Sequence, residues 1–103
     1  MPKEALKMLT ESMFYVLMAF MKGPMCGTDI ADFVNKKSGG AVPMGPATLY
    51  TILAKFEKEE YIREIQVEGR KRTYEITGKG ADAYREEVAR LRRCLSHAEE
   101  ELS

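Results

Sequence analysis

Residues 44–58 read MGPATLYTILAKFEK and predict a helix with two unlike faces. Gly45 is a suitable N-cap, and Pro46 suits the first helical position, where its missing N–H would have had no partner. At about 100° per residue, the apolar side chains of this helix gather on one side. They are Leu49, Ile52, Leu53 and Phe56. That side requires a core behind it.

The opposite side of the predicted helix carries small, hydroxyl-bearing and basic residues, namely Ala47, Tyr50, Thr51, Ala54, Lys55 and Lys58. An ordinary solvent-exposed face would more often carry Glu and Gln. We therefore expect another macromolecule to approach this face closely. The simpler interpretation is an amphipathic helix whose outer residues meet only water.

The charge balance of the chain neither requires nor excludes a nucleic-acid partner. Its 103 residues include 16 basic and 16 acidic side chains, for a formal net charge of +0. This balance argues against tight non-specific binding to nucleic acid but permits a local basic site. The length predicts one domain. The longest apolar run, residues 13–21, is too short to span a bilayer, and no targeting signal is evident, so we expect no membrane partner and a cytoplasmic location.

The residue types predict neither an enzyme nor a metal site. Cys26 and Cys94 lie far apart without a CxxC spacing, and His97 is the single histidine. No nucleophile has a plausible base, so we expect no catalysis and no cofactor. Two reduced thiols are the default interpretation of the cysteines, and a redox switch through Cys26 and Cys94 is the alternative.

Two helices are predicted before residue 44. Residues 2–22 predict a long first helix because apolar residues recur at alternating spacings of three and four, at Leu6, Leu9, Met13, Val16 and Phe20. Further apolar residues widen this face around most of the helix, so we expect a second copy of the chain to cover part of it. A Gly-Pro turn at 23–24 ends the helix, and residues 26–37 predict a second, shorter one.

Beyond residue 58 the pattern changes to a strand period. Residues 61–68 and 73–77 alternate apolar and polar side chains, which predicts the two strands of a hairpin. Between them Gly69 precedes three basic residues, Arg70, Lys71 and Arg72. A solvated turn is the simpler interpretation, but a triply basic hairpin end favours an anionic partner. We interpret the hairpin as a wing.

The last part of the chain predicts a dimerisation helix. Thr77 is a reasonable N-cap. An unbroken spacing of three and four then joins Ala81, Tyr84, Val88, Leu91, Leu95, Ala98 and Leu102, as in a coiled coil of three heptads. The predicted fold class is therefore mainly α with a small β-hairpin. It comprises a winged helix-turn-helix domain at residues 1–77 and a coiled-coil-like dimerisation helix at residues 78–103.

In combination these features resemble the PadR family of winged-helix transcriptional regulators, and more narrowly its short members with a single C-terminal helix. The resemblance is carried by PATLY at 46–50, EKEEYI at 57–62 and GRKRTYEITGKG at 69–80, together with the turn at 23–24. The chain departs from the family where Ala47 and Glu60 replace frequent glycines, and it contains no tryptophan. The resemblance implies a dimeric repressor that binds double-stranded DNA at an inverted-repeat operator.

The expected DNA contacts are Ala47, Thr48 and Thr51 near base edges, Tyr50 and Lys55 on phosphates, and Arg70, Lys71 and Arg72 on phosphates or in the minor groove. The expected contacts of the homodimer are Leu6, Leu9, Met13, Tyr84, Val88, Leu91, Leu95, Ala98 and Leu102.

An effector site is expected from the methionines of the first helix, because flexible methionines adapt to varied ligands. Met8 and Met13 would form one wall of a cavity for a small hydrophobic effector at the dimer interface. The resemblance places such a cavity between the first and last helices, so Leu91 and Leu95 would form the opposite wall. Core filling is the simpler interpretation of the methionines. The competing function for the whole chain is a winged-helix module that binds protein rather than DNA.

Overall fold

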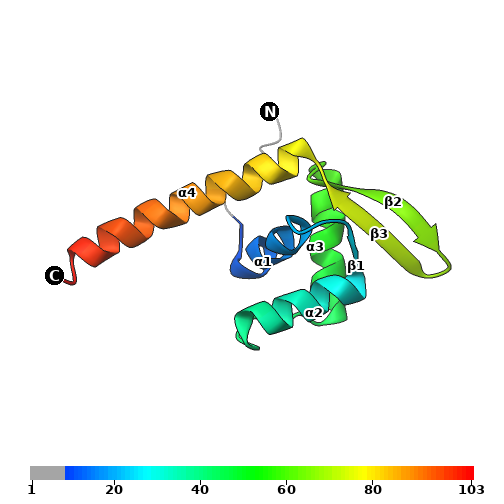
Figure 1. Cartoon of the computed structure of the whole chain (residues 1–103), viewed down its shortest axis with the longest axis horizontal. Helices are drawn as coiled ribbons and strands as arrows, with labels where there is room; N and C mark the ends of the chain where they lie inside the picture. Colours follow the sequence, from blue (N-terminus) through cyan, green and yellow to red (C-terminus); the bar gives the residue numbers. More distant parts are fainter. Residues whose placement is uncertain (1–8) are drawn as a thin grey trace.

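The computed structural model describes residues 9–103 and confirms the expected fold class (Figure 1). In chain order its elements are α1 (Glu11–Phe20), β1 (Met25–Cys26), α2 (Gly27–Ser38), α3 (Pro46–Lys58), β2 (Ile62–Glu68), β3 (Lys71–Ile76) and α4 (Gly78–Glu100). Helices α1, α2 and α3 gather in the centre, the β2–β3 hairpin projects on one side, and α4 projects on the other. None of the helices within residues 9–103 has the length and apolar character needed to cross a membrane.

The core lies where the three central helices meet. Its largest fully buried side chains are Phe20, Phe56, Leu17, Ile30, Val16 and Val34. All four residues predicted for the inner side of α3 are at most 5% exposed, which confirms that prediction. Burial of one such side chain contributes about 1.5–3 kcal/mol. The core therefore fixes the rotation of α3 about its own axis.

Helix α1 begins later than the sequence predicts. The predicted helix starts at residue 2, but α1 starts at Glu11, and Leu9 and Thr10 precede it in a non-helical conformation. The Thr10 side chain accepts a hydrogen bond from the backbone N–H of Met13 at 3.1 Å, so Thr10 is the N-cap. The apolar spacing continues through this cap, which is why periodicity alone misplaces the start. The expected contacts Leu6 and Met8 lie outside the described residues.

Helix α1 is covered largely by its own chain, with contacts to α2, β3 and α4. Its buried residues are Met13, Val16, Leu17, Ala19 and Phe20. Phe14, on another side of α1, stacks on Tyr84 of α4 with ring centroids 5.2 Å apart. Met13, expected at the dimer interface and in the effector cavity, is 5% exposed and packs in this core. Much of the cover expected from a second copy therefore comes from α4.

The sheet has three antiparallel strands in the order β1-β3-β2. Strand β1 was not predicted, because two residues are too few to show a period. Its pairs are Met25 with Tyr74 and Cys26 with Thr73, which joins the start of α2 to the wing. The predicted second strand, residues 73–77, is displaced, because β3 already includes Lys71 and Arg72. The tip of the wing is thus Gly69–Arg70, and Gly69 turns the chain with a φ of 61°.

The start of α4 is locked against the turn between α3 and β2. Thr77 is the N-cap, as predicted, and its Oγ1 accepts from the Gly80 N–H at 3.1 Å. The Thr77 hydroxyl donates to the carbonyl oxygen of Glu60 at 2.6 Å. The backbone N–H of Thr77 donates to the carbonyl oxygen of Tyr61 at 2.9 Å. Glu60 itself has a φ of 62°, a left-handed conformation that glycine adopts more easily.

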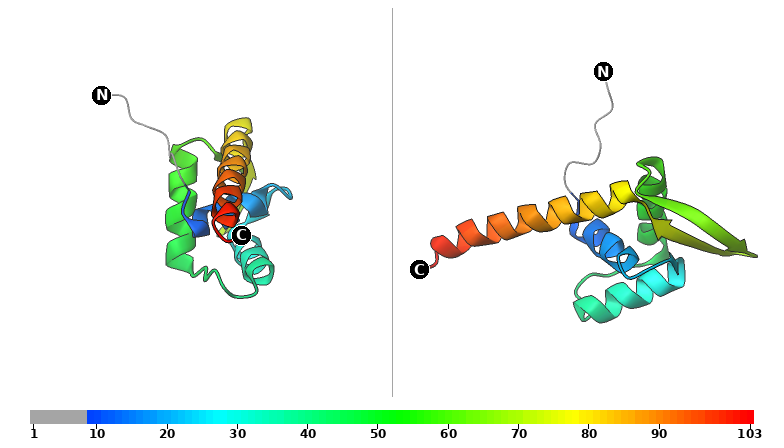
Figure 2. Two further views of the ribbon diagram at one scale, coloured as in Figure 1. Left: turned by 90° about the vertical axis from the view of Figure 1, so that its left-hand side faces the viewer. Right: turned by 45° about the horizontal axis from the view of Figure 1, so that its top comes forward.

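The two halves of α4 have different surroundings. In the first half Glu87 is 5% exposed, and Arg90 donates two hydrogen bonds to its carboxylate at 2.8 and 2.7 Å. From residue 91 to the end of the helix, and on to residue 103, every residue is exposed. Leu91, Leu95 and Leu102 are 39%, 59% and 87% exposed. The second half of α4 extends past the central helices in the right-hand view of Figure 2, so the predicted seam lacks a partner within the described chain.

Candidate nucleic-acid interface

The outer face of α3 is exposed, as predicted. Its exposed residues include all five expected DNA contacts of the helix, Ala47, Thr48, Tyr50, Thr51 and Lys55, and Tyr50 is 64% exposed. Gly45 is the N-cap and Pro46 occupies the first helical position. Because Gly45 has no side chain, it offers no cap to the N–H groups of the first turn, which leaves this end of α3 open to an anion.

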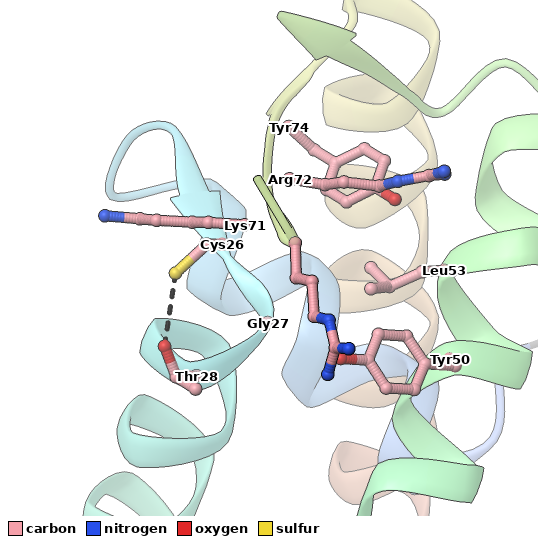
Figure 3. Close-up of a pocket in the computed structure, with 9 residues that line it drawn as sticks. Cys26, Gly27, Thr28, Tyr50, Leu53, Lys71, Arg72 and Tyr74 are labelled. Atoms are coloured by element: carbon pink, nitrogen blue, oxygen red, sulfur yellow. Dashed lines mark hydrogen bonds between the residues drawn. The ribbon is translucent and has the colours of Figure 1, made fainter. Parts of the chain in front are cut away.

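Helix α3 forms a ridge between two hollows. The first has a volume of about 390 Å³, lies against the start of α1, and is lined by Thr10, Ser12, Met13, Ala47, Thr48, Thr51, Ile52 and Lys55. The second, which we call the wing-side hollow, has a volume of about 470 Å³ and is lined by Cys26, Gly27, Thr28, Tyr50, Leu53, Arg70, Lys71, Arg72 and Tyr74 (Figure 3). The expected DNA contacts of α3 are therefore divided, with Tyr50 facing the wing and Lys55 facing α1.

The wing-side hollow brings Tyr50 together with three cations of the wing, Arg70, Lys71 and Arg72. Neighbouring residues on a strand project to opposite faces. Figure 3 accordingly shows Lys71 and Arg72 pointing in opposite directions. Lys71 influences Asp29 at the start of α2 through its charge. The sequence pattern predicted a single cluster of three basic residues at the end of the hairpin. The structure instead places them along one edge of the wing-side hollow.

Arg72 has partners within the protein. Its Nε lies 3.6 Å from Oε2 of Glu64, on the neighbouring strand β2. A hydrogen bond with the Tyr74 hydroxyl, together with the charge of Glu64, raises the pKa of Arg72 above its ordinary value. Burial raises the pKa of Tyr74, so at neutral pH the phenol is neutral and the guanidinium is charged. Neither Arg70 nor Lys71 forms an ion pair with another residue of the range 9–103.

Cys26 is a buried, hydrogen-bonded residue in the lining of this hollow. It is 4% exposed and has a free thiol, which donates to Oδ2 of Asp29 at 3.2 Å. Asp29 also accepts from the backbone N–H of Cys26 at 3.3 Å, and these two hydrogen bonds lower the pKa of its carboxyl group. Cys94 is a free, exposed cysteine on α4. Among the described residues, no group of three or more His, Cys, Asp or Glu side chains could hold a metal ion.

Sequence reasoning missed the residues that reach the two hollows from α1 and α2. Thr28 and Gly27 enter the wing-side hollow because β1 pairs with β3, a contact between distant parts of the chain. A Cβ on Gly27 would lie 3.8 Å from the Tyr50 hydroxyl, so the Tyr50 ring stands beside the start of α2. Ser12 reaches the other hollow because α1 starts there. The local signal that could have located this start is the capping residue Thr10.

Comparison with solved structures finds the same architecture in other proteins. The chain is similar to a transcriptional regulator from Clostridium thermocellum, with a TM-score of 0.77 and 23% identity over 86% of this chain and 87% of that chain. It is similar to a PadR family transcription regulator from hypervirulent Clostridium difficile, with a TM-score of 0.79 and 16% identity over 91% of this chain and 100% of that chain. It is also similar to Bacillus subtilis PadR in complex with operator DNA, with a TM-score of 0.65 and 21% identity over 74% and 45%. At these identities the likeness shows the fold alone.

A search of curated proteins gave no significant match. A family model described as "Transcriptional regulator PadR-like family" matches residues 16–86, which is more than half of the chain. The matched range contains α3, the wing and every residue that lines the wing-side hollow. The chain therefore belongs to the PadR-like family of transcriptional regulators.

Proposed function

We propose that this protein is a repressor that binds double-stranded DNA as a dimer, with α3 in a major groove and the wing beside the flanking minor groove. The observation that carries the proposal is the wing-side hollow of about 470 Å³, where Tyr50 meets Arg70, Lys71 and Arg72 beside the exposed face of α3. A DNA strand between α3 and the wing would pass its phosphates over this hollow. Bacillus subtilis PadR, which has a similar fold, was solved with operator DNA, and this supports the proposal.

The residues of α3 would have different roles on the two sides of the ridge. Tyr50 would contact a phosphate on the wing side, and Lys55 would contact one on the α1 side. Ala47 and Thr48 would lie near base edges. The Thr51 hydroxyl already donates to the Ala47 carbonyl oxygen at 2.8 Å. Thr51 would therefore offer a base only its lone pairs and its methyl group.

The proposed dimer forms through the second half of α4. Leu91 and Leu95 offer an exposed apolar face there, Ala98 continues the same seam, and the exposed Leu102 follows the end of the helix. Pairing two such helices would set the distance between two copies of α3. The operator would then be an inverted repeat whose half-sites lie about 34–36 Å apart, or a multiple of this distance.

In this proposal residues 1–77 contact the DNA and residues 78–103 set the spacing between the two copies. This division separates two functions and not two independently packed units, because the first half of α4 packs on α1. A cytoplasmic location is part of the proposal, since the partner is DNA.

We extend the proposal to a small hydrophobic effector at the dimer interface, held against Leu91 and Leu95. Among the expected effector contacts that the structure describes, these two offer exposed apolar surface, whereas Met13 is buried in its own chain. Such an effector would act only through different affinities for two arrangements of the dimer.

The proposal is tested by a mobility-shift titration with the DNA upstream of the protein's own gene, at several salt concentrations. The double variant Arg70→Ala, Lys71→Ala should bind more weakly, and its log–log salt dependence should fall by about 0.9 for each phosphate that the protein no longer neutralises. The matched control is Lys36→Ala, Lys37→Ala, which removes the same charge from exposed positions at the end of α2.

Binding that is insensitive to salt, or equal effects of the two double variants, would refute the proposed interface. Because the net charge is +0, a protein partner for the same fold would then be the better hypothesis.

A further inference from the structure

Glu64 is an acidic side chain on the same face of the wing as Arg72 and Tyr74, which line the wing-side hollow. It lies directly opposite Tyr74 in the β2–β3 register, so the two side chains project to the same face. Arg72 stands two residues from Tyr74 on that face, and its Nε is 3.6 Å from Oε2 of Glu64. Glu57, near the end of α3, is a further negative charge that acts on Arg72. Two carboxylates of the protein itself, those of Glu64 and Glu57, therefore act on Arg72.

A phosphate and a carboxylate compete for the same guanidinium, because both bind arginine through charge-assisted hydrogen bonds. The Glu64–Arg72 pair is solvated, with side-chain exposures of 33% and 63%, and pairs of this kind are weak enough to exchange. If Arg72 moved to a phosphate, it would leave the Glu64 carboxylate unpaired beside the DNA backbone. Both effects oppose the contact between Arg72 and DNA.

We propose that Glu64 competes with DNA phosphates for Arg72 and thereby weakens sequence-independent binding to DNA. The inference rests on the proposed function and adds a residue that limits it. Arg70 and Lys71 are available to any duplex, whereas Arg72 first has to leave Glu64. Of the three cations that line the wing-side hollow, two therefore have no ion-pair partner within residues 9–103, and the third, Arg72, has one.

The same hairpin supplies a matched control. Arg63 and Glu75 are also opposite each other in the register, and Nε of Arg63 donates to Oε2 of Glu75 at 2.6 Å. They project to the other face of the hairpin, because each is next in sequence to a residue of the Glu64–Tyr74 pair. Glu64→Gln and Glu75→Gln each remove one negative charge and one Arg–Glu pair. The two substitutions differ in which face of the hairpin loses the charge.

The experiment measures the affinity of the full-length protein for an unrelated DNA duplex by fluorescence anisotropy at several salt concentrations. Glu64→Gln should bind about two- to fivefold more tightly than the wild type, the range expected from the strength of exposed ion pairs. Its log–log salt dependence should be steeper by about 0.9, because one further phosphate is contacted. Glu75→Gln should match the wild type. In an Arg72→Ala background, Glu64→Gln should no longer change the affinity.

A second measurement reports the pair without DNA. The Nε–H signal of Arg72 in a nitrogen-edited NMR spectrum of the free protein should shift in Glu64→Gln and stay in place in Glu75→Gln. Adding the duplex to the wild type should move this signal again.

Equal affinities of Glu64→Gln and Glu75→Gln, with clear binding by the wild type, overturn this inference alone. An advantage of Glu64→Gln that persists without Arg72 also overturns it, because simple repulsion between Glu64 and DNA would then explain the effect. Failure of every variant to bind any duplex overturns the proposed function, and this inference with it.

Discussion

Replacing Gly80 by Ala should destabilise the fold, whereas the same replacement of Gly78, in the same turn of α4, should stabilise it. A Cβ on Gly80 would lie 2.2 Å from the carbonyl oxygen of Tyr61 and 2.9 Å from Cγ1 of Ile76. The first of these contacts is with backbone, so a change of rotamer cannot relieve it. Overpacking typically costs about 1–3 kcal/mol, and this rigid contact belongs at the upper end of that range.

The gain in helix propensity opposes this loss. Alanine is favoured over glycine by up to about 1 kcal/mol within a helix, so the net effect of Gly80→Ala is a loss of about 2 kcal/mol. A Cβ on Gly78 meets nothing within 4 Å. Gly78→Ala therefore retains only the gain, about 0.5–1 kcal/mol.

Urea unfolding followed by far-UV circular dichroism measures both effects. The protein concentration has to be the same for all variants, because association adds to the apparent stability. In a thermal melt the loss of about 2 kcal/mol corresponds to a fall in Tm of about 8–16 °C for a domain of this size. A Gly80→Ala protein as stable as Gly78→Ala would refute the conclusion that packing against Tyr61 locks the start of α4.

Three further outcomes follow from the structure. Glu60→Gly should raise the free energy of unfolding in urea by up to about 1 kcal/mol, because the φ of Glu60 is 62°; a lower value would contradict strain at this turn. Leu95→Asp should shift the sedimenting species toward monomer because Leu95 is 59% exposed on the proposed seam, whereas His97→Asp should not; identical behaviour of the two would show that the seam is misassigned. Between neutral and acid pH, the free energy of unfolding of Glu87→Gln should fall less than that of the wild type. The hydrogen bonds from Arg90 hold the pKa of Glu87 below its ordinary value of 4.5, so this stabilisation is present above pH 4.5 and is lost as the pH falls through the folded-state pKa. Unfolding titrations between about pH 3 and pH 7 that superimpose for wild type and variant would exclude this contribution.

Helix α3 could be predicted from the sequence because its pattern is local. Thirteen residues repeat the period of a helix several times, and the same period separates the buried Leu53 from the exposed Tyr50. The start of the helix also has a local cause, since Gly45 and Pro46 are adjacent to it. Thr77 was predicted as a cap for the same reason.

The start of α1 and the bounds of β3 were mispredicted for different reasons. The apolar spacing of α1 continues past its cap, so the spacing carried no information about where the helix begins. Lys71 and Arg72 resemble turn residues because charged side chains are common in turns. They belong to β3 because Glu68 and Val67 pair with them across the hairpin. Such pairing depends on the register of two strands, which a one-strand pattern does not contain.

The wing-side hollow could be predicted in its parts but not as a whole. Tyr50 and the basic residues were each predicted to face DNA. Their meeting with Thr28 depends on the pairing of Cys26 with Thr73, between residues 47 positions apart in the chain. The Glu64–Arg72 contact likewise depends on the bulge that shifts the register between Glu64 and Gln66.

The lock around Thr77 has a mechanical consequence. Thr77 is the single residue between the end of β3 and the start of α4, so the wing continues into the long helix without a flexible linker. The 23 residues of α4 make a rod about 34 Å long with its pivot at Thr77. A tilt of about 10° at this pivot would displace the far end by roughly 6 Å. The wing and α4 should therefore move together, so that a small rotation of the wing displaces the far end of α4 and a displacement of α4 rotates the wing.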